Sequence, residues 1–205
     1  MTPLDKIILG IDPGTNVLGY GVIKLHGRKV TMEAMGVIDL RQCKDTYLKL
    51  GRIYERVMGI IDAFKPDELA IEAPFFGKNV QSMLKLGRAQ GVVIAAAICR
   101  DIPIHEYAPL KIKQAITGNG QASKEQVAAM MQRILHIPQE SMLPYLDATD
   151  ALGVAYCHYL QSGKPDCNNT VAHSWKTFIN QNADRVRPVS YTHLSCRRIA
   201  LCRSR

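Results

Sequence analysis

The feature that most constrains the fold is a long apolar run over residues 6–23, KIILGIDPGTNVLGYGVI. One acid, Asp12, interrupts it at the point where the run meets Pro13-Gly14-Thr15. Such a run predicts buried β-strands on either side of a turn. A carboxylate at the end of a buried strand is costly to remove from water unless positive charge or hydrogen bonds meet it. Asp12 is therefore either a metal ligand or a residue that caps the turn.

The segments that follow extend this start into an α/β fold. Apolar runs bounded by turn residues predict strands at 6–12, 17–25, 29–40, 68–72 and 102–107. Apolar residues at helical spacing and capping signals predict helices at 48–64, 79–100, 109–118, 124–136 and 144–160. Three strands in sequence form an antiparallel meander, and strands alternating with helices then add parallel neighbours. We expect a mixed five-stranded sheet with helices on both faces.

Composition bounds the class of protein. The chain has 205 residues, of which 47% are hydrophobic and 21% charged, as in ordinary soluble globular proteins. The longest apolar block, residues 92–99, is far shorter than the roughly 20 residues of a membrane-spanning helix. The N-terminus has no signal-peptide layout, so we expect a cytoplasmic protein. Six cysteines without CxxC spacing predict reduced thiols.

The charge is unevenly distributed. A formal net charge of +8 favours a polyanionic partner. Residues 188–205 hold four arginines and no acid, and their composition differs from that of the rest of the chain. We therefore expect one folded domain at 1–163, a linker with a short C-terminal segment at 164–187, and a disordered or non-native tail at 188–205.

Four acids are candidates for chemistry. Asp147 and Asp150 are three residues apart, so they share one helix face, although acids in a first helical turn can simply complement the helix dipole. Asp12 and Glu72 each end an apolar strand, where they could converge on that face. Converging carboxylates repel one another unless divalent cations bind, and oxygen ligands favour Mg²⁺ or Mn²⁺. His158, two helical turns after Asp150, is predicted to be a packed core histidine.

Five motifs occur in order along the chain: GIDPGT (10–15), AIEAPFFGKN (70–79), LKLGRAQG (84–91), EYAPLKIKQAITGNG (106–120) and LDATDALGVAYCH (146–158). Together they resemble the RuvC family of Holliday junction resolvases, over about residues 6–160. The resemblance implies a ribonuclease H-like fold, a homodimer, and metal-dependent cutting of four-way DNA junctions at two symmetry-related strands in recombination and repair. It also implies RuvA and RuvB as partners.

The resemblance assigns roles to particular residues. The acidic tetrad falls on Asp12, Glu72, Asp147 and Asp150, which would bind Mg²⁺, with Mn²⁺ as a substitute and two ions in each site. The basic residues near the scissile phosphate match Lys113 and Lys124, and the aromatic at the junction centre matches Phe75 or its neighbour Phe76. Three further basic residues are predicted to contact DNA phosphates: Lys78, Lys85 and Arg88. The apolar helix at 79–100 is the expected dimer interface.

Three alternatives remain at this stage. A related ribonuclease H-like nuclease could act on RNA–DNA hybrids or on other branched DNA. Asp12-Pro-Gly-Thr followed by Gly19 also resembles the first phosphate loop of the actin-like ATPases, but 205 residues contain no second copy of that loop. A catalytically silent junction-binding protein is the third alternative, and the presence of all four acids argues against it.

Overall fold

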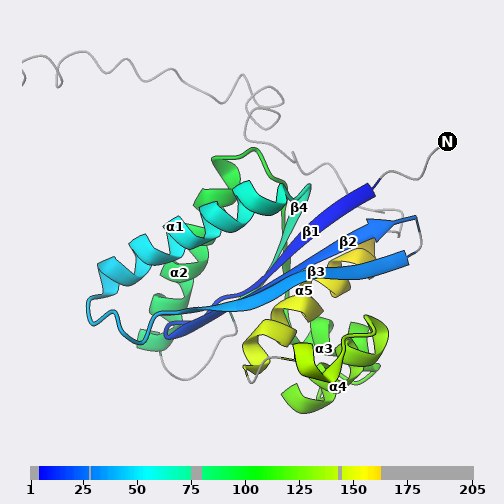
Figure 1. The fold of residues 1–205 in the computed structure, drawn as a ribbon. Helices are drawn as coiled ribbons and strands as arrows, with labels where there is room; N and C mark the ends of the chain where they lie inside the picture. The colour runs from blue at the N-terminus through cyan, green and yellow to red at the C-terminus, as the bar shows by residue number, and fades with distance from the viewer. Residues whose placement is uncertain (1–4, 28, 75–79, 143–144, 163–205) are drawn as a thin grey trace, which may run out of the picture. The chain divides into compact units, whose positions relative to one another are not determined.

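The computed structural model describes residues 5–27, 29–74, 80–142 and 145–162, all within the unit Met1–Asn168 (Figure 1). The predicted linker at 164–187 and tail at 188–205 lie outside the described residues. The described helices include none that is long and apolar enough to cross a membrane.

A single five-stranded sheet, in the order β3-β2-β1-β4-β5, forms the centre of the fold. Strands β1 (Asp5–Asp12), β2 (Val17–His26) and β3 (Lys29–Asp39) form the antiparallel meander. Strands β4 (Glu68–Glu72) and β5 (Ile104–Tyr107) continue the sheet in parallel from β1. The predicted mixed sheet is confirmed.

Helices cover both faces of this sheet (Figure 1). Helices α1 (Thr46–Phe64) and α2 (Val80–Ile98) lie on one face, and α3 (Pro109–Thr117), α4 (Lys124–Ile134) and α5 (Leu146–Ser162) on the other. Because side chains alternate along a strand, Leu9 and Ile11 join the core under α1 and α2, whereas Ile8 joins the core under α5. Every predicted element that the structure describes ends within two residues of its expected position.

Local capping explains where the helices begin and end. Ser123 and Gln126 form the predicted capping box at the start of α4, each side chain accepting a hydrogen bond from the other residue's backbone N–H. Gly118 adopts φ 75° and ends α3. The cap of α1 was not predicted: the Asp45 side chain accepts a hydrogen bond from the backbone N–H of Leu48. That cap starts the helix at Thr46.

Two glycines let α5 rest its backbone directly on the sheet. A Cβ atom added at Gly19 would lie 1.9 Å from the carbonyl oxygen of Asp147, and one added at Gly10 would lie 2.2 Å from that of Ala151. No side chain larger than hydrogen fits at these positions. Gly19 pairs with Asp12 across β1 and β2. The start of α5 is therefore held against the end of β1, which brings the acids of both elements together.

Candidate active site

Two of the predicted acids stand at the same edge of the sheet. Asp12 is the last residue of β1 and Glu72 the last residue of β4. The strands are parallel neighbours and Ile11 pairs with Ile71, so the acids one position further along lie side by side. Strand alternation places both on the face that α5 covers.

Helix α5 brings the other two acids from its first turns. One carboxylate oxygen from each of Asp12, Asp147 and Asp150 lies within 4.8 Å of the others. Glu72 is outside this group of three but lines the same hollow as Asp12 and Asp150. The structure thus brings the four predicted acids to one place.

Both predicted lysines accompany the acids. Lys124, the first residue of α4, places its Nζ atom 2.6 Å from Oδ2 of Asp150 and 3.2 Å from Oδ1 of Asp147. Lys113 of α3 lines the hollow that Glu72 and Asp150 also line. Positive charge therefore reaches the carboxylates from the two helices packed beside α5.

The carboxylates nevertheless carry more negative charge than these lysines offset. Burial, together with repulsion from Glu72, raises the pKa of Asp12 well above its ordinary value. Burial, together with repulsion from Asp150, raises the pKa of Glu72 to about 7. Burial also raises the pKa of Asp150, although Lys124 opposes it. Such a set of oxygen donors fits a hard divalent cation, Mg²⁺ or Mn²⁺, whose charge would favour the ionised carboxylates.

A second hollow, of about 250 Å³, opens beside the loop that follows Asp12. Its lining includes the loop residues 14–16 and three lysines. Lys44 precedes α1, Lys49 lies in α1 and Lys85 lies in α2. Lys49 Nζ donates to Oδ1 of Asn16 at 2.9 Å. Lys85 was predicted, but Lys44 and Lys49 were not, because only the tertiary fold brings them beside the loop at 14–16.

The remaining predicted residues are Arg88, Phe75, Phe76, Lys78 and His158. Arg88 is exposed on α2. Phe75, Phe76 and Lys78 lie outside the described residues. His158 is 2% exposed, which confirms the prediction of a packed core histidine.

The sheet has the strand order of a ribonuclease H-like nuclease, and its acids stand where that class of protein has them: at the ends of β1 and β4 and in the first turns of α5. The family model described as crossover junction endodeoxyribonuclease RuvC matches residues 8–158. The chain belongs to the RuvC family. RuvC of Bacteroides fragilis is 64% identical over 183 residues, which is 89% of this chain and 97% of that protein. RuvC of Porphyromonas gingivalis is 58% identical over 189 residues, 91% of this chain and 100% of that one.

Solved structures agree with this assignment. Thermus thermophilus RuvC in complex with a Holliday junction substrate is 33% identical, with a TM-score of 0.70 over 77% of this chain and 94% of that chain. The yeast mitochondrial Holliday junction resolvase Ydc2 is 14% identical, with a TM-score of 0.56 over 76% of this chain and 80% of that one, so it supports the fold alone. The predicted ribonuclease H-like fold and the family are both confirmed.

Proposed function

We propose that the chain resolves Holliday junctions by metal-dependent hydrolysis of one phosphodiester bond in each of two symmetry-related strands, leaving 5′-phosphates. The observation that carries the proposal is the convergence of Asp12, Asp147 and Asp150 within 4.8 Å, with Glu72 and Lys113 on the same hollow. The RuvC relative solved with a Holliday junction substrate supports the choice of DNA.

The four acids would hold Mg²⁺, or Mn²⁺ in its place, with two ions in each site. Cations bound there supply Lewis-acid activation of the attacking water and of the leaving oxygen. The carboxylate of Asp12 lies within 4.8 Å of those of Asp147 and Asp150 and lines one hollow with Glu72, so it would join the strand-side and helix-side ligands. Glu72 on the strand side and Asp147 and Asp150 on the helix side would then complete the ligand set.

The lysines act on the phosphate. Lys124 pairs with Asp147 and Asp150. If a divalent cation bound these carboxylates, it would replace the ammonium of Lys124, which could then turn to the scissile phosphate. Lys113 lines the same hollow from α3. Fixed positive charge at this position stabilises the negative charge that develops on the phosphate in the transition state.

Other basic residues would position the DNA. Lys44, Lys49 and Lys85 line the hollow beside the loop at 14–16, where they can contact phosphates without reading bases. Exposed Arg88 would extend this contact surface along α2, and the phosphate contact of Lys78 is a proposal from its positive charge. Insertion of Phe75 or Phe76 at the junction centre is a proposal from resemblance.

A homodimer would match the two-fold symmetry of the junction. One face of α2 exposes a stripe of apolar and small residues, spaced three or four apart: Val80, Leu84, Gly87, Gly91, Ala95 and Ile98. Nothing lies within 4 Å of a Cβ built at Gly87 or Gly91, so a second helix has room to approach closely. We propose this stripe as the dimer interface. RuvA and RuvB as partners are a prediction from the resemblance, and action in the cytoplasm is a prediction from the N-terminal sequence.

The proposed function is tested by the choice of substrate. With Mg²⁺, the full chain should cut a synthetic four-way junction in paired strands, and cut a linear duplex or an RNA–DNA hybrid much less. Asp147→Asn should abolish cutting and keep junction binding in a gel-shift assay. Asp101→Asn, at an exposed turn with φ 55°, is the matched control and should cut normally. Preference for the hybrid would support the alternative nuclease, and normal cutting by Asp147→Asn would remove that residue from the site.

A further inference from the structure

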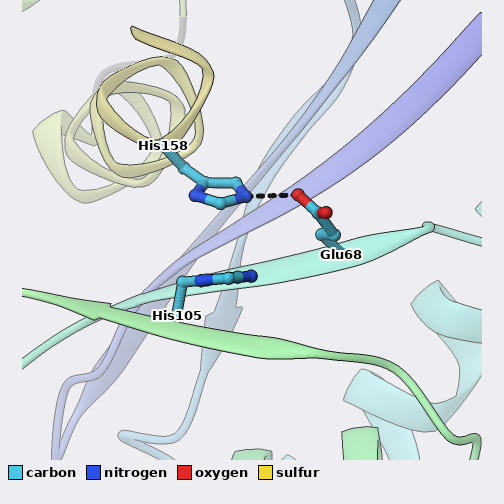
Figure 2. Close-up of side chains that lie close together, drawn as sticks. All are labelled: Glu68, His105 and His158. Atoms are coloured by element: carbon cyan, nitrogen blue, oxygen red, sulfur yellow. Dashed lines mark hydrogen bonds and ion pairs between the residues drawn. The ribbon is translucent and has the colours of Figure 1, made fainter. Parts of the chain in front are cut away.

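A second cluster of ligand-type side chains consists of Glu68, His105 and His158 (Figure 2). It lies at the other end of the elements that carry the acids. Glu68 begins β4, whereas Glu72 ends it, and His158 follows Asp150 on α5 by eight residues. Four strand residues span about 13 Å and eight helical residues about 12 Å. His105 of β5 pairs with Ala70, so it faces α5 on the same side of the sheet as Glu68. The cluster is therefore separate from the carboxylate site.

The donor atoms of this cluster already lie close together. One ring nitrogen of His105, one of His158 and one carboxylate oxygen of Glu68 are all within 4.8 Å of one another. The two imidazole rings stack with centroids 4.2 Å apart, and Nε2 of His158 points at Oε2 of Glu68 (Figure 2). Ligands of a tetrahedral zinc ion lie roughly 3.3 Å apart. Side-chain shifts of about an ångström, in which His158 and Glu68 separate and His105 approaches them, would therefore fit the set around one ion.

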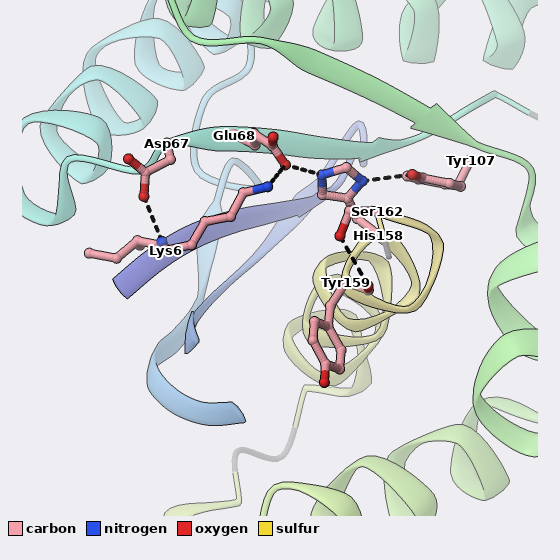
Figure 3. A network of polar contacts seen from close by, with 8 residues as sticks. Lys6, Asp67, Glu68, Tyr107, His158, Tyr159 and Ser162 are labelled. Atoms are coloured by element: carbon pink, nitrogen blue, oxygen red, sulfur yellow. Dashed lines mark hydrogen bonds and ion pairs between the residues drawn. The ribbon is translucent and has the colours of Figure 1, made fainter. Parts of the chain in front are cut away.

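Tyr107 holds His158 in the orientation that a ligand needs. Its Oη atom lies 2.7 Å from Nδ1 of His158, on the side of the ring opposite Glu68 (Figure 3). Nε2–H of His158 donates to the carboxylate of Glu68, which can only accept. A metal ion would take the place of this proton, and Nδ1–H would then donate to Tyr107 while the lone pair of Nε2 faces the ion. Metal-binding histidines commonly donate their second ring nitrogen in this way, which fixes the tautomer and the ring plane. Tyr107 is 7% exposed, so this contact is itself held by packing.

Lys6 competes for the same carboxylate. Its Nζ atom lies 2.7 Å from Oε2 of Glu68, and the two side chains are 33% and 21% exposed. The cluster therefore has a route to solvent beside Lys6, although His158 is buried. A divalent ion bound to Glu68 would displace the ammonium, which the flexible lysine stem permits.

From this geometry we propose that Glu68, His105 and His158 form a second metal site, which takes Zn²⁺ or another divalent transition ion rather than Mg²⁺. Two imidazole nitrogens and one carboxylate oxygen suit such ions, whereas Mg²⁺ prefers the all-oxygen set at the other end of α5. An ion there ties α5 to β4 and β5. Its role is to hold the helix that carries Asp147 and Asp150 against the strand that carries Glu72.

The test measures Zn²⁺ binding by calorimetry. The parent protein for this test is the full chain with Asp12→Asn and Asp147→Asn, two changes that weaken the carboxylate site. This parent should bind one Zn²⁺ per chain and rise in melting temperature with Zn²⁺. Glu68→Gln and His105→Gln should each remove this binding event. Tyr107→Phe should weaken it by roughly 10–100-fold, the usual effect of losing such a partner. Lys6→Met should tighten it, because the competing ammonium is gone.

Two controls make the result decisive. His136→Asn replaces an exposed histidine at a turn with φ 51°, which asparagine tolerates, and should bind Zn²⁺ like the parent. Co²⁺ used as a spectroscopic probe should show visible bands without the charge-transfer band that thiolate ligation gives. Equal affinity in His105→Gln and His136→Asn, no stoichiometric binding by the parent, or a thiolate band would each overturn the proposal.

Discussion

Asp12 and Glu72 show how a residue that opposes folding can mark a functional site. Each ends a strand under α5, and burial together with neighbouring acids raises the pKa of both carboxyls. Ionising them in the folded chain costs free energy that the unfolded chain does not spend. Divalent cations would reverse this effect, since they bind the ionised form.

A pH dependence follows from Glu72. Its pKa is about 7 in the folded chain, above the ordinary value of 4.5, so the unfolded chain loses its proton first as pH rises. Without divalent cations, the free energy of unfolding should therefore fall between pH 5 and pH 8. Denaturation with a chelator present measures this, and Glu72→Gln should flatten the slope.

Two comparisons check that interpretation. Mg²⁺ should stabilise the wild-type chain more at pH 8 than at pH 5, because its ligands are then ionised. Glu68, whose pKa is lowered to about 2 by His158 and Lys6 against the effect of burial, titrates below this window. An unchanged slope in Glu72→Gln would show that another group controls the pH dependence.

Among the elements, α5 is positioned by its backbone contact with β1 and β2. An alanine at Gly19 would place Cβ 1.9 Å from the carbonyl oxygen of Asp147, which cannot move unless the helix moves. Gly19→Ala should lower the free energy of unfolding by about 1–3 kcal/mol, as overpacking does. It should also lose junction cutting, measured with the same four-way substrate, because Asp147 is displaced from Asp12.

A glycine in open space provides the control for that change. Gly59 lies on the exposed face of α1, and nothing lies within 4 Å of a Cβ atom built there. Gly59→Ala should stabilise the chain by about 0.5–1 kcal/mol and leave cutting unchanged. Full cutting activity in Gly19→Ala would contradict the view that close packing of α5 positions the acids.

At the scale of the whole molecule, the exposed apolar stripe on α2 predicts a dimer, and one charged side chain introduced into the stripe should dissociate it. Gly91→Glu places a carboxylate in the middle of the stripe and should convert the dimer to a monomer in light-scattering measurements. Paired cutting should then become single, uncoupled nicking. Gly51→Glu on α1, also in open space, should remain dimeric. A dimeric Gly91→Glu protein would exclude this face as the interface.

Most of the fold was predictable because its signals are local. Apolar periodicity and capping residues such as Ser123 placed the described elements, and acids at strand ends drew attention to Asp12 and Glu72. The lysine-lined hollow and the cluster of Glu68 and His158 were not predicted. Their members come from segments far apart in the chain and share no spacing, so only tertiary structure reveals them. The roles of the lysines beside the acids came from family resemblance, because an isolated lysine carries no local signal.

The distribution of the acids over the chain also has a consequence for biosynthesis. Asp12 belongs to the first strand and Asp150 to the last described helix, and α5 packs on β1 through Gly10 and Gly19. A chain emerging from the ribosome therefore cannot assemble its ligand set before α5 has been made. Contacts between such distant segments also form late in folding, because closing long loops is slow. An incomplete chain would thus lack the site at which we propose that DNA is cut.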